Sequence, residues 1–519
     1  MRILRLFQRH WILLFVVLIS FTYLSFRLGA STLWDFDEAN YAAIARNIVR
    51  SNEWVTLRWT LEPWLLKPPL FFWLTAISFK VFGINEFAAR FVSVVSATGV
   101  VLLTMLLIEK VTQNKKIALL SVGVLLASSQ FVLMARNGTT DMLLTLLITA
   151  SFYFGAKAIE DKSSYWSYLL VGCSVGLAVL TKNIIGFFPL GVLGIYGLVT
   201  GEWKNIRWRH VLLLVASLMV VALPWHIAAY LKNGQQFINI YFLDELMKRA
   251  TSDFQGHPAP VYWYAEVLIQ SFKPFIFLLP VVAFINVLDF LKGNKRLLLF
   301  ILWPTLLVAF FSLSKDKLAW YILPVYPALI VMIGAALNRM LHYPSEYPAT
   351  KNYMFFAATA GLLLGHLHFE FKMMALILVV FTALFLLGVF WLSKMRVSMD
   401  ARIMESLFVL VLLVSCALNW LALPSQPNAN MDLKNVCSDL ELNRNSTKLF
   451  LIGFYFQGPT YYCDLKNVRM IRASEITGTL PAEGETFLYL IKSSDFESNN
   501  LDESMIFRKS GDVYLLKRD

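Results

Sequence analysis

The candidate catalytic and binding residues of this 519-residue sequence lie in four polar segments between long apolar stretches. Two carboxylates, Asp37 and Glu38, are adjacent, and Asp141 opens a later apolar stretch. The other candidates are four cations and a phenol, namely Lys67, Arg249, Lys315, Lys317 and Tyr321. A carboxylate can activate a hydroxyl group or bind a divalent metal ion, and Lys or Arg can hold a phosphate group as it leaves. These residue types together predict group transfer from a phosphate-linked donor.

Each candidate also has a purely structural interpretation. Asp37 precedes a helical pattern and Asp141 begins an apolar stretch, so either side chain could cap a helix N-terminus. Lys315 and Lys317 could extend along a membrane surface as anchors. His257 is a candidate metal ligand, but a lone histidine is more often a packed or surface residue. The sequence leaves both interpretations open.

The composition excludes an ordinary soluble enzyme. Hydrophobic residues make up 58% of the chain, charged residues make up 15%, and the mean hydropathy is +0.60, whereas a soluble protein is about 25% charged. A soluble fold could not bury so much apolar side chain, and disorder and coiled coil are excluded with it. The chain is therefore predicted to be an all-α polytopic membrane protein. Its net charge of +12 is attributed to basic cytoplasmic loops, and no nucleic-acid partner is expected.

Thirteen apolar runs of about 17 to 25 residues, the length that crosses a bilayer, are predicted as transmembrane helices. They lie near residues 10–29, 87–108, 117–135, 141–158, 165–181, 184–200, 210–230, 271–290, 297–313, 319–338, 353–369, 373–393 and 404–422. Two shorter segments in the outer loops, near 37–48 and 68–83, are predicted as interfacial or re-entrant helices. These elements would bring the polar segments together on the outer face.

Basic residues predict which way the helices point. Arg2, Arg5 and Arg9 precede the first span, and every other strongly basic short loop falls on the same side when the spans alternate. That side is cytoplasmic by the positive-inside rule, so an odd number of spans places the C-terminus outside. The expected topology has a cytoplasmic N-terminus and an outer C-terminus.

A change of composition near residue 425 predicts two domains, a membrane domain over 1–424 and a soluble domain over 425–519. The second domain carries 11 Lys or Arg and 13 Asp or Glu, as soluble proteins do. A small α/β or mostly β domain is indicated by its β-like runs, which are Lys448–Phe456, Thr486–Lys492 and Val513–Lys517. Cys437 and Cys463 can form a disulfide in an oxidising periplasm, and the alternative is two free thiols.

Several motifs follow one another in a specific order. The first is Asp37-Glu38-Ala39-Asn40-Tyr41-Ala42, and the next two are Lys67-Pro68-Pro69-Leu70 and Phe87-Ala88-Ala89-Arg90. A second acidic motif runs from Ala135-Arg136 to Asp141-Met142, and Leu180-Thr181-Lys182, Pro224-Trp225 and the segments 311–315 and 321–324 come after it. This order resembles the C-type glycosyltransferases of the protein mannosyltransferase-like superfamily, in the branch that includes bacterial lipid A aminoarabinose transferase. The resemblance covers about residues 30–335.

The resemblance implies a C-type glycosyltransferase fold that is surrounded by membrane lipids. It also implies an inverting transferase whose donor is a sugar linked to a polyprenyl phosphate. It implies catalytic roles for Asp37, Glu38 and Asp141. It also implies donor-phosphate contacts from Lys67, Arg249, Lys315, Lys317 and Tyr321. Two positions depart from the family pattern. Asn40 stands where these enzymes usually have Arg, and Leu66 stands where they have Glu. His257 therefore lacks its expected partner in a metal site, and the need for a divalent metal ion stays open.

The function that this resemblance implies is transfer of a sugar to lipid A or another envelope glycolipid at the periplasmic face of a bacterial inner membrane. An amino sugar such as 4-amino-4-deoxy-L-arabinose is one candidate, and Asp37 would orient or deprotonate the acceptor with help from Asp141. One alternative is a protein O-mannosyltransferase, which would need a groove for an acceptor peptide. A more distant alternative is a lipid-linked sugar transporter, which would carry charges at the membrane midplane. The predicted spans are nearly free of charge, which disfavours the transporter.

Overall fold

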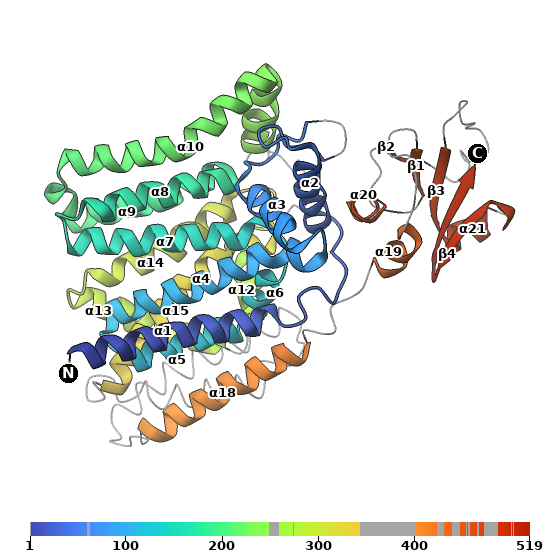
Figure 1. Ribbon diagram of the computed structural model, residues 1–519. Helices are drawn as coiled ribbons and strands as arrows, with labels where there is room; N and C mark the ends of the chain where they lie inside the picture. The colour runs from blue at the N-terminus through green and yellow to red at the C-terminus, as the bar shows by residue number, and fades with distance from the viewer. Residues whose placement is uncertain are drawn as a thin grey trace.

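The computed structural model describes residues 2–59, 63–248, 259–272, 275–342, 401–422, 430–438, 447–452, 454, 457–463, 467–471, 486–499, 501 and 503–518. These residues form a large helical bundle and a small domain that contains a β-sheet (Figure 1). The fold prediction of a helical membrane part followed by a small α/β domain agrees with this architecture.

The bundle consists of apolar helices that lie side by side (Figure 1). Among the described residues, six helical segments are long and apolar enough to cross a membrane, or up to eight if each of two bent pairs is one span. The bundle helices are α1 (Arg2–Ser25), α4 (Glu86–Thr112), α5 (Lys115–Ala127), α6 (Ser129–Ala135), α7 (Thr140–Glu160), α8 (Tyr165–Lys182), α9 (Phe188–Thr200), α10 (Trp208–Phe237), α12 (Trp263–Ser271), α13 (Leu279–Leu291), α14 (Arg296–Leu313), α15 (Tyr326–His342) and α18 (Ala401–Ala422).

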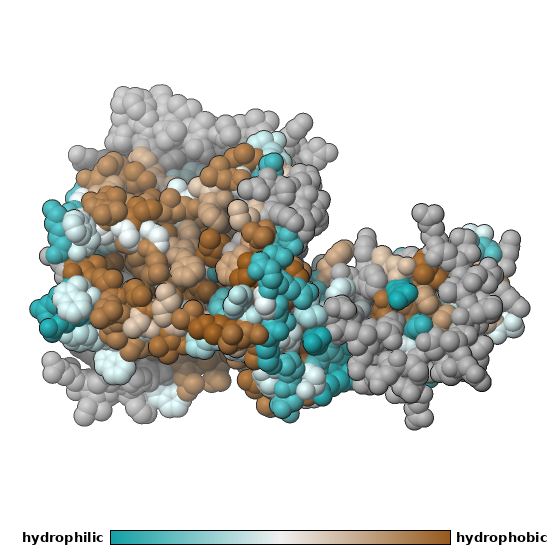
Figure 2. Space-filling model, turned by 90° about the horizontal axis from the view of Figure 1, so that it is seen from above, coloured by the Kyte–Doolittle hydropathy of each residue, from teal (hydrophilic) through white to brown (hydrophobic). Residues whose placement is uncertain are grey.

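The outer surface of the bundle is apolar, as contact with lipid requires. On α10, Val220 and Leu231 are 74% and 77% exposed, an arrangement that water would disfavour. Figure 2 shows hydrophobic residues over much of one side of the bundle, and hydrophilic residues in a band between the bundle and the C-terminal domain. The chain is therefore a multi-pass membrane protein, and its polar functional residues belong to one end of the bundle.

Two predicted spans are bent rather than straight. α5 and α6 together cover the predicted span 117–135, but they meet at Ser128 at an angle of 73°. The Ser128 hydroxyl donates to the carbonyl of Val124 at 2.7 Å, and such back-bonding bends helices. α12 and the helical segment Phe275–Leu291, which covers the predicted span 271–290, differ in direction by 114°. The predicted spans 353–369 and 373–393 lie outside the described residues, so the total of thirteen stays a prediction.

The predicted spans 165–181 and 184–200 are the separate helices α8 and α9. The 3₁₀ segment η1 (Asn183–Phe187) turns the chain between them, and Lys162 before α8 pairs with Glu202 after α9 at 2.7 Å. Gly186 makes the turn possible, because a Cβ at this position would lie 2.3 Å from the backbone nitrogen of Val179. The turn leaves Lys182, the last residue of α8, at the polar end of the bundle.

Two short helices cover that end, where the sequence predicts helices near 37–48 and 68–83. They are α2 (Asp37–Ser51) and α3 (Leu70–Phe82), and both lie across the end of the bundle nearest the C-terminal domain (Figure 1). α2 buries a stripe at helical spacing that includes Tyr41, Ile44 and Ile48. The Tyr41 ring meets the rings of Phe71 and Phe72 edge to face, which fixes α2 against α3.

The C-terminal domain is built on a five-stranded sheet with the order β2-β1-β3-β5-β4. Its strands are β1 (Thr447–Ile452), β2 (Asn467–Met470), β3 (Thr486–Lys492), β4 (Ile506–Ser510) and β5 (Val513–Arg518). β1 is parallel to β2 and β3, whereas β5 is antiparallel to β3 and β4. The three predicted strands are confirmed as β1, β3 and β5. Neither β2 nor β4 was predicted from the sequence. β2 has only four residues, and no residue of β4 is buried.

Both faces of the sheet are covered, which explains why β1 and β3 in its interior are largely apolar and buried. One face packs against α19 (Met431–Cys437) through Leu433 and Val436. The other packs against α21 (Ser493–Ser498) through Phe496. Cys437, the last residue of α19, is bonded to Cys463, which directly follows α20 (Gln457–Tyr462). The predicted disulfide is confirmed.

Candidate active site

Asp37 is the first residue of α2 and is half-buried. It makes no capping hydrogen bond, because Phe36 is the capping residue and its side chain cannot accept one. Phe36 has φ 68°, a left-handed conformation that costs a bulky residue free energy. Within the described part of the chain, Asp37 has neither a hydrogen-bond donor nor a cation as partner. The structural interpretation of Asp37 as a helix cap is therefore disfavoured, and the side chain remains available for chemistry.

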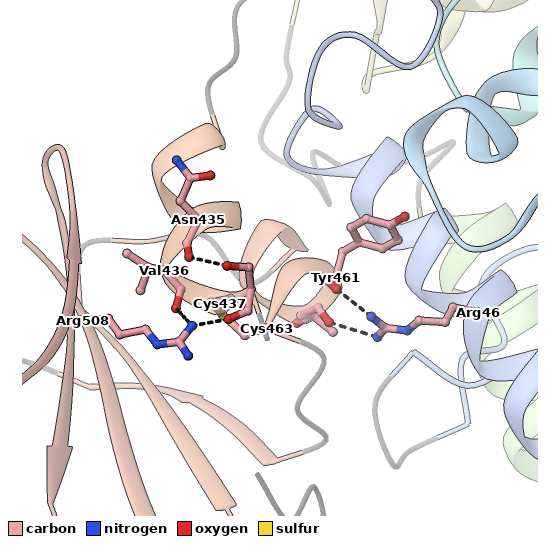
Figure 3. The surroundings of a disulfide bond; sticks show 9 residues. Arg46, Asn435, Val436, Cys437, Tyr461, Cys463 and Arg508 are labelled. Atoms are coloured by element: carbon pink, nitrogen blue, oxygen red, sulfur yellow. Dashed lines mark hydrogen bonds between the residues drawn. A yellow bond between two sulfur atoms is a disulfide. The ribbon is translucent and has the colours of Figure 1, made fainter. Parts of the chain in front are cut away.

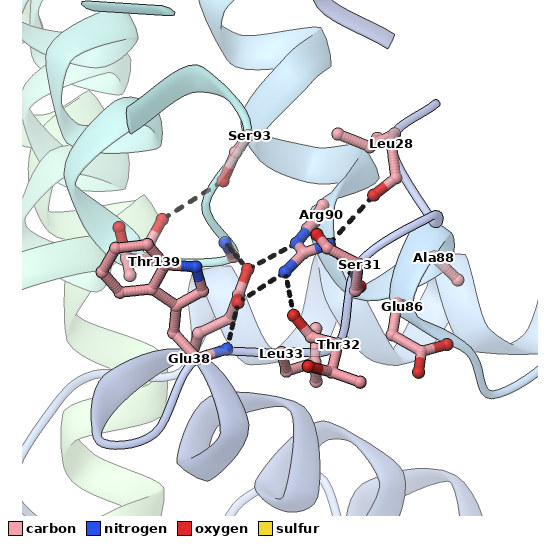
Figure 4. A network of polar contacts seen from close by, with 12 residues as sticks. Leu28, Ser31, Thr32, Leu33, Glu38, Glu86, Ala88, Arg90, Ser93 and Thr139 are labelled. Carbon is pink, nitrogen blue, oxygen red and sulfur yellow. Dashed lines mark hydrogen bonds and ion pairs between the residues drawn. The ribbon is translucent and has the colours of Figure 1, made fainter. Parts of the chain in front are cut away.

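Glu38, in contrast, is fully engaged (Figure 4). Its two oxygens accept from Nε and Nη2 of Arg90 at 2.7 and 2.9 Å, a bidentate pair, and both side chains are almost fully buried. They also accept from the backbone amides of Trp34 and Gly138 at 2.7 and 2.8 Å. With each oxygen accepting twice, Glu38 has no lone pair left for a reacting group. The geometry favours a positioning role for Glu38 over the catalytic role that the resemblance implies.

Arg90 ties the same carboxylate to the loop before α2. Its Nη1 donates to the carbonyls of Leu28 and Ser31, and its Nη2 donates to the carbonyl of Thr32. The Glu38–Arg90 pair thus joins three segments that are distant in sequence, namely the first loop, α4 and the 136–140 loop. Gly138 allows this approach, since a Cβ there would lie 3.0 Å from the carbonyl oxygen of Ala89.

Asp141 lies in the first turn of α7 and is 3% exposed. Its Oδ1 atom is 2.6 Å from Nζ of Lys182. The same ammonium group lies over the ring of Tyr321, 4.3 Å from the centroid, in a cation–π contact. The structure therefore brings Asp141 and Tyr321 together, as the resemblance implies, and it adds Lys182 between them.

Lys67 forms a second buried ion pair. Its Nζ atom lies 3.3 Å from Oε1 of Glu245, and the two side chains are 11% and 6% exposed. Glu245 belongs to the π-helical segment η3 (Ile238–Lys248), which continues α10. Leu65, two residues before Lys67, packs in one apolar cluster with Leu180, two residues before Lys182. The two ammonium groups are thus carried by segments that pack against each other.

The remaining predicted residues have different surroundings. Lys317 is buried and donates to the carbonyls of Ala259 and Ser314, so it holds two loops together. Lys315 is exposed in the loop before the 3₁₀ segment η5 (Ala319–Val325), which contains Tyr321. Arg249 and His257 lie outside the described residues. Within the described residues, no group of three or more His, Cys, Asp or Glu side chains could hold a metal ion.

The sequence assigned no role to Lys182 or Arg90, although both stand in the quoted motifs. Each is a charged residue within or directly after an apolar stretch, where an unpaired charge is costly. This cost indicates that each charge has a partner. The sequence alone does not identify Asp141 as the partner of Lys182 or Glu38 as the partner of Arg90. No role was predicted for Glu245 either, because the sequence does not identify Lys67 as its partner.

Comparison with known proteins points to one family. Residues 66–227 match the family described as dolichyl-phosphate-mannose-protein mannosyltransferase. An uncharacterized protein of Aquifex aeolicus (strain VF5) is 32% identical over 331 residues, which are 63% of this chain and 73% of that protein. The undecaprenyl phosphate-alpha-4-amino-4-deoxy-L-arabinose arabinosyl transferase of Enterobacter sp. (strain 638) is 29% identical over 339 residues. That match covers 63% of this chain and 60% of the transferase, so the chain spans about three fifths of its length.

The fold has a close counterpart among solved structures. The crystal structure of ArnT from Cupriavidus metallidurans bound to undecaprenyl phosphate superposes with a TM-score of 0.73 and covers 98% of each chain. The apo form of the same protein superposes with a TM-score of 0.74. At 20% identity this likeness establishes a common fold, and it agrees with the C-type glycosyltransferase architecture that the motifs imply.

Proposed function

Since this chain belongs to the C-type glycosyltransferases of the protein mannosyltransferase-like superfamily, we propose that it transfers a sugar from a polyprenyl-phosphate donor to an envelope glycolipid. Undecaprenyl phosphate is the proposed carrier, because the named relatives are undecaprenyl phosphate-alpha-4-amino-4-deoxy-L-arabinose arabinosyl transferases. Lipid A is the proposed acceptor, as the resemblance of the sequence motifs implies. An amino sugar such as 4-amino-4-deoxy-L-arabinose is the proposed cargo. The reaction takes place at the periplasmic face of a bacterial inner membrane.

The observation that carries this proposal is the contrast between Asp37 and Glu38. Glu38 is locked by Arg90 and two backbone amides, and this lock holds the helix start from which Asp37 projects. The Asp37 carboxylate keeps its oxygens available to accept a hydrogen bond from an acceptor hydroxyl. Two buried ammonium groups, Lys67 and Lys182, come from neighbouring segments. A base and a set of cations are the two components that glycosyl transfer from a phosphate requires.

The proposed mechanism assigns one step to each component. Asp37 accepts the proton of the acceptor hydroxyl while the acceptor oxygen attacks the anomeric carbon of the donor sugar. The bond between that carbon and the phosphate oxygen breaks, its electron pair passes to the phosphate, and the configuration inverts. The departing polyprenyl phosphate gains one negative charge, so cationic contacts strengthen in the transition state. Lys67, Lys182 and Arg249 are proposed to supply these contacts, with Tyr321 beside Lys182.

The disulfide supports the proposed orientation of the chain. A bond between Cys437 and Cys463 persists in oxidising compartments such as the periplasm, and the positive-inside rule places the C-terminal domain on that side. An alkaline phosphatase fused after Asp519 is expected to be active, and a β-galactosidase fused at the same point inactive. The reverse pattern would contradict the orientation and the periplasmic site together.

Mass spectrometry of the cell envelope tests the function as a whole. Lipid A and envelope glycans are compared between cells that contain the gene and cells that lack it. A sugar-sized mass difference on lipid A or another glycolipid is the expected result. The family description also names protein mannosyltransferases, so glycopeptides are measured in the same cells. A mass difference confined to peptides would favour that alternative acceptor and contradict the glycolipid proposal.

A further inference from the structure

The loop that precedes Asp37, residues 31–36, lies between the helical bundle and the C-terminal domain. On the bundle side Arg90 donates to the carbonyls of Ser31 and Thr32. On the other side the contacts come from residues about 400 positions later in the chain, as a hydrogen bond between Asn430 and Leu33 illustrates. The loop is thus held from two directions, and the C-terminal domain supplies one of them.

Asn430, directly before α19, makes three contacts with this loop. Its side-chain amide donates to the carbonyl of Leu33 at 2.8 Å and to the carboxylate of Asp35 at 3.4 Å, and its backbone amide donates to the hydroxyl of Thr32. Asn430 is 5% exposed. An asparagine that is buried and bonded at several points fixes the path of the backbone it touches.

Tyr462, the last residue of α20, makes the second set of contacts. Its hydroxyl accepts from the backbone amide of Leu33 at 2.7 Å and donates to the carboxylate of Glu86 at 3.3 Å. Burial raises the pKa of Tyr462 far above neutral pH, so the hydroxyl keeps the proton that it donates. Lys434 of α19 pairs with the same oxygen of Glu86. Tyr462 of the C-terminal domain therefore connects the loop before Asp37 to the start of α4.

Gly458, in α20, approaches the loop more closely than any larger residue could. A Cβ at this position would lie 2.4 Å from Oδ1 of Asp35 and 3.1 Å from Oδ1 of Asn430. The backbone amide of Gly458 also forms a hydrogen bond with Asp35. Asp35 is two residues from Asp37, so a displacement here is transmitted directly to the proposed base.

The disulfide holds together the two helices that carry these contacts (Figure 3). Cys437 ends α19 and Cys463 follows α20. Arg46 of α2 donates to the carbonyls of Tyr461 and Thr460 at the end of α20, at 2.6 and 3.1 Å. α20 has only six residues, and an isolated helix of this length is unstable. Without the disulfide, its position would therefore depend mainly on these side-chain contacts.

We propose that the C-terminal domain is a positioning element of the active site. Asn430 and Tyr462 hold the loop before Asp37, and the disulfide keeps α19 and α20 together so that they can do so. This inference rests on the proposed function, because it assigns the domain a role in aiming the proposed base.

Hydrogen exchange followed by mass spectrometry tests the holding contacts without any assay of activity. The full-length protein in lipid nanodiscs is compared with Tyr462→Phe, which keeps the ring and removes the hydroxyl. Loss of one buried hydrogen bond is expected to speed exchange in peptides that contain Leu33 about fivefold to tenfold. Tyr514→Phe is the matched control, because Tyr514 packs on the sheet face covered by α21, and its Leu33 peptides should exchange as in the wild type. Equal exchange at Leu33 in all three proteins would overturn the proposal.

Kinetics then separate positioning from a merely structural contact. At saturating lipid donor, Tyr462→Phe and Asn430→Ala are expected to lower kcat about tenfold, while the donor KM changes less than about twofold. The control Asn435→Ala, whose amide faces Ser510, should leave both unchanged. Reduction of the disulfide in the wild type should reproduce the effect of Tyr462→Phe. Faster exchange at Leu33 with an unchanged kcat would overturn the positioning role. A wild-type protein without transferase activity would instead refute the proposed function, and the exchange data would still decide whether the domain holds the loop.

Discussion

The Nζ atom of Lys182 lies 2.6 Å from Oδ1 of Asp141, although 41 residues separate the two in the chain. Asp141 lies in the first turn of α7 and Lys182 ends α8, so the pair joins the polar ends of two adjacent helices. Both side chains are largely buried. The carboxylate therefore holds the ammonium group over the ring of Tyr321, and we propose that this ammonium group contacts the donor phosphate.

Removing one partner of this pair should destabilise the protein more than removing both. Lys182→Met leaves the carboxylate of Asp141 buried without a cation, a change that costs about 3–5 kcal/mol. The double variant Asp141→Asn/Lys182→Met should recover most of the thermal unfolding midpoint, because no unpaired charge remains. Its transfer rate should stay low, because the cation is gone. A double variant with normal stability and normal transfer would contradict the role of Lys182.

Glu38→Gln distinguishes the positioning role from a catalytic one. The substitution leaves the buried Arg90 guanidinium without its anion, so the unfolding midpoint should fall by an amount that corresponds to about 3 kcal/mol or more. The control is Glu53→Gln, since Glu53 pairs with Lys232 at the surface, where such pairs contribute about 1 kcal/mol or less. If Glu38→Gln were as stable as the wild type but inactive, Glu38 would be catalytic instead.

The Lys67–Glu245 pair predicts opposite effects on donor binding. Lys67→Ala should weaken binding of undecaprenyl phosphate about tenfold or more, because a cationic contact to the phosphate is lost. Glu245→Gln should tighten binding several-fold, because the carboxylate competes for Lys67 and repels the phosphate. Equilibrium binding in nanodiscs measures both. Weaker binding in both variants would mean that the pair is structural.

The half-buried Asp35 predicts a pH dependence of the protein's stability. Burial raises the pKa of this carboxyl above its ordinary value, although Asn430 and Gly458 donate to it. The folded state therefore holds its proton more tightly than the unfolded state, and stability falls as pH rises through the window above about pH 4. Asp35→Asn should match the wild-type unfolding midpoint near that pH and exceed it increasingly toward neutral pH. A constant difference at every pH would contradict this account of Asp35.

Sequence reasoning predicted the elements better than their contacts. Apolar length predicts a membrane helix because the bilayer imposes that length, and strands β1, β3 and β5 are apolar enough to stand out from a charged domain. The bend at Ser128 was not predictable, because the segments on both sides of it are apolar like those of a straight span. It depends on how the helices pack rather than on composition.

The site was predictable in residue type but not in pairing. Asp37 and Glu38 are adjacent and chemically alike, yet one is unengaged and the other accepts four hydrogen bonds. That division depends on Arg90 and Gly138, which are 52 and 100 positions from Glu38. The contact of Tyr462 with Leu33 spans 429 positions, and nothing in the local sequence of either residue indicates it.

The rate of sugar transfer by Asp37→Asn tests the central claim most directly. Purified wild type and variant are compared in nanodiscs with undecaprenyl-phosphate 4-amino-4-deoxy-L-arabinose at saturation and with lipid A as acceptor. The substitution preserves size and should leave the unfolding midpoint unchanged, because Asp37 makes no capping bond. It removes the base, so the proposed mechanism predicts that kcat falls at least about 100-fold. A well-folded Asp37→Asn protein with a near-normal kcat would contradict it.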